Sequence, residues 1–306
     1  MDVSIIYVNY KTAQLILDSI QSVKEKTDGI TYEIIVVDNN SGDESLAKIT
    51  AVYPEVIPVQ SEENVGFGRA NNLGIQIAKG HCFFFLNPDT LLINNAIKIL
   101  YDFLNGSEHV GACGGNLYSI DNKPAISFSA LFPSFLQEVL SIFYLPVTFF
   151  SKSKSEQFNY TGSPLDVASI SGADLLLKRE VLEKTGGFDP AFFMNYEETE
   201  LCYRIKKQGY RIVSVPDAQI IHLEGKSDYA SISRLTFYYQ GQYIYFNKLY
   251  GKSGSNLIYA ITQLKNRLRV LQFSILGDAK RKTYWQTKKE TNSEVFRSFR
   301  KRNIQQ

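Results

Sequence analysis

Polar side chains follow a strongly apolar run at residues 33–37. The next four residues are Asp38, Asn39, Asn40 and Ser41. Ligands of parallel α/β sheets bind outside the carboxyl ends of the strands, so an acidic residue there can hold the base or ribose of a nucleotide. Asn, Ser and Asp also favour helix N-caps, which is the alternative role for this segment. Asp38 and Asn40 are therefore candidate nucleotide-binding residues.

A second polar segment, Asn87-Pro88-Asp89, follows the apolar run at residues 83–86. A carboxylate at a sheet edge can bind a hard divalent ion, which typically takes one or two carboxylates plus substrate phosphates. The alternative is a turn before a helix capped near Thr90. Farther along the chain, His222 ends another apolar run. With Asp89 it could complete a metal site, although a single His at a strand end is more often structural.

A glycine-containing turn leads into a predicted helix at residues 62–72. Helix N-termini and glycine-rich turns attract phosphates, and Arg69 could help to hold a diphosphate. A dinucleotide-binding fingerprint has the pattern G-x-G-x-x-G after the first strand. Here the third glycine position is Asn71, and the turn after the first predicted strand, residues 9–12, has no glycine. The segment therefore predicts a phosphate site and argues against a Rossmann dehydrogenase.

Three carboxylates, Glu197, Glu198 and Glu200, stand within four residues at the start of a predicted helix. Acids at this position interact favourably with the helix dipole, which accounts for one or two of them. Three are more than capping needs, so one of them is a candidate general base.

Apolar runs and helical periodicities alternate over the first 118 residues, which is typical of a mostly parallel sheet covered by helices. Strands are predicted at residues 3–8, 33–37, 56–60, 81–86 and 110–118, and helices at 12–26, from 43, at 66–78 and at 92–104. The second half has predicted helices at 179–185 and 197–208, strands at 211–215 and 218–222, and a helical pattern from 229 onward.

The bulk composition is that of an ordinary globular protein, with 306 residues of which 44% are apolar and 21% charged. The three cysteines, Cys82, Cys113 and Cys202, include no C-x-x-C pair. They argue against a disulfide framework and a structural zinc site, and they fit a reducing cytoplasm. The N-terminus has no basic leader followed by an apolar stretch, so no signal peptide is expected.

Positive charge is concentrated at the C-terminus, where residues 263–306 contain 12 Lys and Arg against 3 Asp and Glu. Such a tail suits an anionic partner, either a membrane surface or a nucleic acid. The alternative is a solvated helical face. A nucleic acid is disfavoured because the aromatic residues form no recognisable stacking surface and the charge is confined to the end.

Between Lys123 and Lys152 the only charged residue is Glu138. Pro133 and Pro146 interrupt this apolar stretch, and no uncharged run reaches the roughly 18 residues that a transmembrane helix needs. Residues 125–150 are either a flap that faces lipid or acceptor, or core of the second half.

Taken together and in this order, these segments resemble glycosyltransferase family 2, and within it the bacterial rhamnosyltransferase-like branch. The matching segments are residues 3–10, 36–41, 64–72, 85–89, 171–174 and 186–189, the acidic cluster and His222. The resemblance implies the GT-A fold, an α/β domain over residues 1–228 with a nucleotide-binding half of about 1–119 and an acceptor half of about 120–228. A helical, basic C-terminal extension, residues 229–306, follows it.

The resemblance also implies roles for single residues. Asp38 would bind the nucleobase or ribose, Asp89 would bind the metal at the position of the family's D-x-D motif, and His222 would be the second protein ligand. Glu198 stands where the family's catalytic base is usually Asp, and Glu200 where the following acid is usually Asp. Two departures matter, because Asn87 replaces the first carboxylate of D-x-D and Glu198 is one methylene longer than the usual base.

The wider predicted site has two further sets of residues. The donor-binding set is Val8, Asn9, Tyr10, Asp38, Asn40, Asn64, Gly66, Phe67, Arg69, Asn71 and Asn87. The acceptor-side or supporting set is Gly172, Ala173, Asp174, Glu197 and Glu200.

The implied function is an inverting glycosyltransferase that depends on Mg²⁺ or Mn²⁺. The donor would be a nucleoside-diphosphate sugar, with dTDP-L-rhamnose the first choice and a UDP-hexose the second. The acceptor would be a glycan or lipid-linked glycan in the synthesis of a bacterial cell-surface polysaccharide of the cell wall or capsule. The expected location is cytoplasmic and peripheral at the inner face of the membrane, reached through the basic C-terminus, and a homodimer is left open.

Two other functions were weighed against this one. A sugar nucleotidylyltransferase needs a loop rich in Gly and Lys or Arg after the first strand, which residues 9–12 do not supply. A non-catalytic nucleotide-sugar-binding or scaffold subunit of a polysaccharide assembly complex stays open because of the departures at Asn87 and Glu198.

Overall fold

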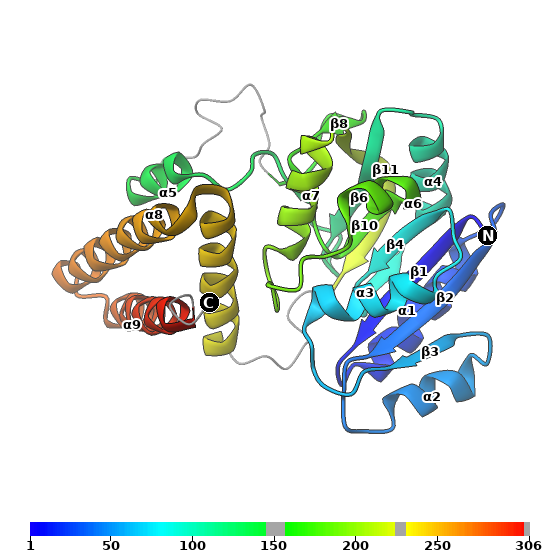
Figure 1. The fold of residues 1–306 in the computed structure, drawn as a ribbon, viewed down its shortest axis with the longest axis horizontal. Helices are drawn as coiled ribbons and strands as arrows, with labels where there is room; N and C mark the ends of the chain where they lie inside the picture. The colour runs from blue at the N-terminus through cyan, green and yellow to red at the C-terminus, as the bar shows by residue number, and fades with distance from the viewer. Residues whose placement is uncertain (145–156, 224–230, 303–306) are drawn as a thin grey trace. The chain divides into compact units, whose positions relative to one another are not determined.

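The computed structural model describes residues 1–144, 157–223 and 231–302 (Figure 1). The chain divides into two compact units. The first comprises Met1–Phe132, Ser155–Phe193 and Glu197–Asp228, and the second comprises Pro133–Lys154, Met194–Tyr196 and Tyr229–Gln306. All the candidate site residues named above lie in the first unit.

Within the described residues, the first unit is built on a nine-stranded sheet of order β3-β2-β1-β4-β10-β6-β11-β5, with β8 paired to β11. Its strands are β1 (Val3–Asn9), β2 (Tyr32–Asp38), β3 (Ile57–Gln60), β4 (Cys82–Leu86), β5 (Thr90–Leu92), β6 (Val110–Tyr118), β8 (Leu165–Asp166), β10 (Asp174–Lys178) and β11 (Arg211–His222). A separate two-stranded sheet contains β7 (Phe128–Ser129) and β9 (Ser169–Ile170). The helices are α1 (Ala13–Lys26), α2 (Ser45–Val52), α3 (Phe67–Ile77), α4 (Ala96–Asn105), α6 (Arg179–Thr185) and α7 (Glu197–Lys207).

The N-terminal half of the sheet is parallel. Strands β3, β2, β1 and β4 run in one direction, and their register places Asn9 beside Asp38 and Asp38 beside Gln60. β10 lies antiparallel between β4 and β6, and β6 and β11 are parallel again. The mostly parallel sheet is therefore confirmed, and the polar residues that follow β1, β2 and β4 meet at one edge of it.

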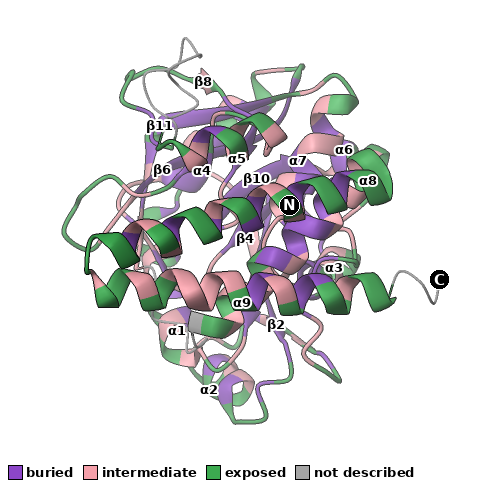
Figure 2. Cartoon of the chain, turned by 90° about the vertical axis from the view of Figure 1, so that its left-hand side faces the viewer, coloured by how far each residue is buried: buried purple, intermediate pink, exposed green. Residues whose placement is uncertain are grey.

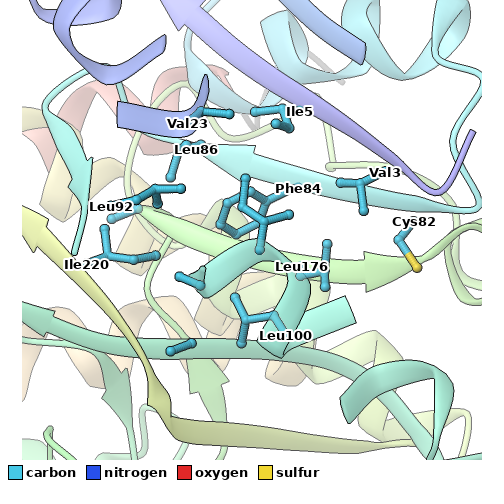
Figure 3. Close-up of a cluster of buried hydrophobic side chains, with 14 of the residues drawn as sticks. Val3, Ile5, Val23, Cys82, Phe84, Leu86, Leu92, Leu100, Leu176 and Ile220 are labelled. Atoms are coloured by element: carbon cyan, nitrogen blue, oxygen red, sulfur yellow. The ribbon is translucent and has the colours of Figure 1, made fainter. Parts of the chain in front are cut away.

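The central strands β1 and β4 are buried along their whole length, because helices cover both faces of the sheet. On one face Ile5, Phe84 and Leu176 pack against Val23 of α1 and Leu100 of α4, as Figure 3 shows. Side chains alternate between the faces of a strand, and so the neighbouring residues of β1 and β4 belong to the core on the other face.

Three details differ from the sequence-based expectation. The helix predicted at 92–104 begins at Ala96, because Thr90–Leu92 is β5, so the alternative of a helix capped near Thr90 is wrong. Residues 38–41 cap no helix, since α2 begins at Ser45. The strands predicted at 211–215 and 218–222 are one strand, β11, whose register with β6 shifts between Ser214 and Gln219, around a proline that has no amide hydrogen.

The second unit contains α5 (Phe135–Ile142), α8 (Ser231–Ile275) and α9 (Ala279–Arg302), which confirms the helical C-terminus. Ser134 caps α5 in a capping box with Gln137. α8 bends at Gly251, whose φ of 67° and ψ of −165° are not helical, and Figure 1 shows its two parts in gold and orange. None of the described helices combines the length and the apolar character that a membrane span requires.

The apolar stretch 125–150 is divided between the units. Phe128 is buried in the core of the first unit, whereas α5 packs against α8 in the second unit and exposes Leu136 and Phe143 on its other side. Residues 145–150 lie outside the described part of the chain. The described part of the stretch is thus core at its beginning and an amphipathic helix after that.

Candidate active site

Asp38 organises the ends of three adjacent strands. Asn9 Nδ2 donates to Asp38 Oδ1 at 2.5 Å, and Ser41 Oγ donates to the same oxygen at 2.6 Å. Gln60 Nε2 and the Ser41 amide donate to Oδ2 at 3.0 and 3.1 Å. Asp38 is 3% exposed, whereas Asn40, with a φ of 59°, is exposed at the tip of the loop. A nucleotide at this edge would therefore share the Asp38 oxygens with four protein donors.

Asn39 joins this group to the turn before α3. Its Nδ2 donates to Asn64 Oδ1 at 2.9 Å, and its Oδ1 accepts from the Val65 amide at 2.9 Å. The Gly66 amide donates to Asn64 Oδ1 at 3.1 Å, and the Phe67 amide donates to the Phe193 carbonyl at 2.9 Å. The amides of Val65, Gly66 and Phe67 are thus already bound to protein acceptors. A phosphate at this turn would have to be held by other groups, such as the Arg69 side chain.

Arg69 is the charged side chain of this turn. It is exposed and donates from Nε to the Pro190 carbonyl at 2.7 Å. Asn71, two residues later and on the other side of α3, is fully buried and donates to the Phe67 carbonyl at 3.1 Å. Asn71 therefore lies inside the unit, whereas Arg69 lies at its surface.

Asp89 and His222 come together where β5 pairs with β11. The β-ladder places His222 beside Thr90, and the Leu223 amide donates to the Asp89 carbonyl at 2.9 Å. His222 Nε2 lies 3.3 Å from Asp89 Oδ1 and 3.4 Å from Asn87 Nδ2. The two predicted metal ligands, 133 positions apart in the sequence, are therefore neighbours.

The donor set at this point fits a divalent cation. A carboxylate suits ions such as Mg²⁺ and Mn²⁺, and an imidazole nitrogen is a ligand of first-row divalent metals. The Asp89 and His222 side chains are only 14% and 13% exposed. Among the described residues no group of three or more His, Cys, Asp or Glu could hold a metal. This matches a site with two protein ligands in which substrate phosphate oxygens and water complete the coordination.

Glu200 has a structural role. It forms an ion pair with Arg204, whose Nε lies 2.9 Å from both carboxylate oxygens. The Arg204 guanidinium also donates to the carbonyls of Thr185 and Gly187 at 2.5 and 2.8 Å. This pair fastens α7 to the turn that follows α6 and leaves Glu197 and Glu198 as the candidates for the base.

Glu197 and Glu198 differ in environment. Burial raises the pKa of Glu197 well above the ordinary value, and the charge of Glu198 raises it further. Burial also raises the pKa of Glu198, but backbone and side-chain hydrogen bonds at Glu198 and Thr199 act in the opposite direction. Glu197 is 4% exposed and Glu198 is half-buried. Glu198 is thus the one that ionises more readily and is open to a substrate.

The loop of residues 171–173 lies between the acid pair and the metal-ligand pair. The Asn87 amide donates to the Ala173 carbonyl at 3.0 Å. A methyl group added at Gly172 would lie 3.6 Å from the Phe67 ring and 3.8 Å from Glu198 Cγ. The loop therefore bonds to the segment that leads to Asp89 and lies beside Glu198.

The remaining predicted residues support this arrangement. Asp174 is fully buried in β10, its Oδ2 accepts from the Gly115 amide at 2.6 Å, and burial raises its pKa well above the ordinary value. Val8 is buried and Tyr10 is half-buried at the end of β1. The sequence-based site omitted Asn39, Ser41 and Gln60, which follow or end predicted strands and could have been found from that position alone.

Comparisons with known proteins agree with this geometry. Residues 4–185 match the model of glycosyl transferase family 2. The chain is 23% identical over 264 residues to the low-salt glycan biosynthesis hexosyltransferase Agl10 of Haloferax volcanii, which covers 84% of this chain and 80% of that protein. It is 26% identical over 227 residues to the N-acetylglucosaminyl-diphospho-decaprenol L-rhamnosyltransferase of Mycobacterium tuberculosis, which covers 69% and 73%.

Two solved structures share the fold. The mannosyltransferase PcManGT of Pyrobaculum calidifontis, in complex with GDP-Man and Mn²⁺, aligns with a TM-score of 0.56 at 16% identity over 96% of this chain and 84% of its own. GalNAc-T7 with UDP, GalNAc and Mn²⁺ aligns with a TM-score of 0.57 at 18% identity over 83% of this chain. This chain spans about half of GalNAc-T7, since the alignment covers 51% of it.

Proposed function

Because the chain belongs to glycosyl transferase family 2 and has the GT-A fold, we propose that it is an inverting, metal-dependent sugar transferase that uses a nucleoside-diphosphate sugar. The observation that carries this proposal is that one loop, residues 171–173, links the surroundings of two pairs of side chains. Asp89 with His222 is the metal-ligand pair and Glu197 with Glu198 is the acid pair. Residues 171–173 bond to Asn87, two residues before Asp89, and lie beside Glu198.

The nucleotide end of the donor lies at the carboxyl ends of β1, β2 and β3 in this proposal. There Asn9 and Asp38 are held in one hydrogen-bonded group, and Asn40 projects from the loop beside it. Arg69 is exposed and can add positive charge for the diphosphate. Asp89 and His222 hold the divalent cation, and when bound there the ion offsets negative charge on the departing diphosphate.

Glu198 is the general base. As the acceptor hydroxyl attacks the anomeric carbon, a new carbon–oxygen bond forms there, the bond to the diphosphate breaks, and the hydroxyl proton passes to the Glu198 carboxylate. Its raised pKa makes it a stronger proton acceptor than an ordinary carboxylate. With one base and no covalent intermediate, the sugar is transferred in a single displacement and its anomeric configuration inverts.

The donor is a dTDP- or UDP-linked sugar, with L-rhamnose the first choice, and the acceptor is a lipid-linked glycan of a cell-surface polysaccharide. Two observations support this choice. The mycobacterial relative is named for an L-rhamnosyl group and a decaprenol-linked acceptor. The basic C-terminal part of the chain suits peripheral contact with an anionic membrane at its cytoplasmic side.

Thermal unfolding with a panel of nucleotides tests the donor and metal sites together. A ligand that binds only the folded state raises the Tm with its concentration. We expect dTDP or UDP compounds to raise the Tm only when Mn²⁺ or Mg²⁺ is present. Asp89→Asn should lose the metal-dependent rise in Tm. Asp121→Asn, a change at an exposed acid, should keep this rise.

Either of two results would count against the proposal. If no nucleotide raises the Tm of the folded protein, the donor site is wrong. If the rise is the same without metal, or survives in Asp89→Asn, the metal assignment is wrong.

A further inference from the structure

The second half of α8 carries its large apolar side chains on the outside. Five Leu and Ile residues of this segment are exposed by 42 to 77%: Leu257, Leu264, Leu268, Leu271 and Ile275. Their spacing of seven, four, three and four residues places them within about 60° of one another around the helix. Leu276, 65% exposed, continues this stripe at the end of the helix. We call these six residues the aliphatic stripe.

The opposite face of the same helix is buried and is mostly polar, with Ile258 and Phe273 as its buried apolar side chains. Its side chains Ser255, Thr262, Gln263, Asn266 and Arg269 are each at most 6% exposed. Gln263 Nε2 donates to the Lys289 carbonyl of α9 at 3.0 Å. Arg269 donates to the carbonyls of Ser141 and Ile142 at 3.0 and 2.9 Å, and its guanidinium lies 3.2 Å from the centre of the Tyr144 ring. In Figure 2 buried and exposed residues alternate along α8 accordingly.

The distribution of polar and apolar side chains around the second half of α8 is the reverse of that in a helix packed on the core of a soluble protein. Such a helix turns its apolar stripe to the core and its polar face to water. A contiguous exposed apolar surface marks a site of contact with another protein or with a membrane. Since the interior of the second unit holds the polar face through specific hydrogen bonds, the outward direction of the aliphatic stripe is fixed by the fold.

The charges around the stripe are mostly positive, and the one acid near its end, Asp278, is paired with Arg281. Residues 252–277 contain no Asp or Glu. Arg267 lies exposed beside the stripe, and Lys280 and Arg281 are exposed just after it, followed by Lys282. A second copy of this surface would bring like charges together, because a two-fold interface places the same patch on both sides. An anionic lipid surface offers both the apolar layer and the opposite charge.

We propose that the aliphatic stripe binds the surface of an anionic membrane. The Leu and Ile side chains enter the boundary between headgroups and acyl chains, and Arg267 and the cations of residues 280–282 lie at the lipid phosphates. The helix lies in the plane of the surface and does not cross it. This inference rests on the proposed function in one respect. A lipid-linked acceptor lies at the membrane, and binding to the membrane brings the protein to it.

Vesicle co-sedimentation tests this surface directly. The full-length protein is mixed with phosphatidylcholine vesicles that either contain or lack phosphatidylglycerol. We expect binding to the vesicles that contain phosphatidylglycerol. The triple variant Leu264→Gln, Leu268→Gln, Leu271→Gln should lower the partition coefficient by about tenfold or more, because three apolar side chains no longer enter the membrane.

A matched control separates the stripe from apolar exposure in general. Val52, Ile77 and Ile120 of the first unit are 56, 40 and 63% exposed, similar to the three leucines at 51, 42 and 57%. Changing these three to Gln should leave vesicle binding unchanged. The variant Lys280→Gln, Arg281→Gln, Lys282→Gln should lose most of the preference for phosphatidylglycerol. The Tm of each variant without lipid shows that it is folded.

Three results would overturn the inference. The wild type does not bind vesicles, the leucine variant binds as the wild type does, or the wild type is a dimer without lipid and the leucine variant is a monomer. The last result would show that a second copy covers the stripe. Nucleotide-dependent stabilisation is measured in parallel, so vesicle binding without any nucleotide effect would contradict the proposed function and leave this surface standing.

Discussion

At the scale of single residues, two adjacent carboxyl groups have different environments. Glu197 is almost fully buried, and its Oε2 has no hydrogen-bond partner among the described residues. A buried carboxyl without partners favours its neutral form. Glu198 beside it is half-buried and has hydrogen bonds that favour the charged form. A neutral Glu197 also spares Glu198 the repulsion of a second negative charge, so Glu198 is the member of the pair that ionises first.

The raised pKa of Glu197 predicts how its replacement changes stability with pH. Because the folded protein holds this proton more tightly than the unfolded chain, the contribution of Glu197 to stability falls as pH rises above the ordinary carboxyl range toward the raised pKa. Gln does not titrate. Glu197→Gln should therefore raise the Tm relative to wild type more at about pH 8 than at about pH 5.

Thermal melts at the two pH values measure this difference. Glu183→Gln, a change at an exposed acid on α6, controls for the loss of one negative charge. A Tm difference for Glu197→Gln that does not change with pH would show that Glu197 is ionised like an ordinary carboxyl.

At the scale of elements, the site depends on how α3 and α7 are fastened to neighbouring turns. Gly66 precedes α3 with a φ of 85°, and a methyl group there would lie 2.1 Å from the Phe193 carbonyl oxygen. Asn72 of α3 also donates to the Phe188 carbonyl at 2.7 Å and accepts from the Phe188 amide at 2.9 Å. These contacts fix Phe67, and through it the loop of Gly172 beside Glu198.

Gly66→Ala tests this attachment. The new side chain meets backbone that cannot move aside, and it also occupies a left-handed conformation. We expect a loss of about 3 kcal/mol in the free energy of unfolding. Gly42 has a similar φ of 68° and nothing within 4 Å of an added methyl group, so Gly42→Ala should cost only about 1 kcal/mol. Urea unfolding measures both. Equal losses in the free energy of unfolding would show that the contact with the Phe193 carbonyl does not add to the cost of Gly66→Ala.

The elements also show what could be predicted from the sequence. The sequence predicts the bounds of several buried strands to within a residue, because buried parallel strands are mostly apolar. These strands are Val3–Asn9, Tyr32–Asp38 and Val110–Tyr118. β5 and the antiparallel direction of β10 were not predicted, because a three-residue strand has no periodicity and strand direction depends on distant connections. The closeness of Asp89 and His222 was predicted from the family pattern, and the pairing of β5 with β11 gives its physical reason.

At the scale of the whole molecule, the two units differ in which side chains they bury and which they expose. The first has a strongly apolar interior with its polar residues gathered at one sheet edge. The second buries aromatic side chains such as Tyr243 and Phe246 together with Gln263, Asn266 and Arg269, and it exposes the aliphatic stripe. Helical periodicity alone predicted helices there but not which face is buried, because both faces of α8 have a regular spacing. The sequence shows the basic charge at the C-terminus but not the exposed stripe beside it. Only the two together allow us to propose an anionic membrane as the partner.

The central claim is sugar transfer with Glu198 as the base, and the turnover of Glu198→Gln tests it most directly. The donor that raises the Tm of the wild type is incubated with metal and acceptor, and release of nucleoside diphosphate and sugar transfer to the acceptor are both followed. We predict that Glu198→Gln slows transfer by about a hundredfold or more and keeps the metal-dependent rise in Tm with the nucleotide. The control Glu183→Gln should turn over as the wild type does. Full turnover by Glu198→Gln would contradict the assignment of the base, and no transfer by the wild type with any stabilising donor would contradict the function itself.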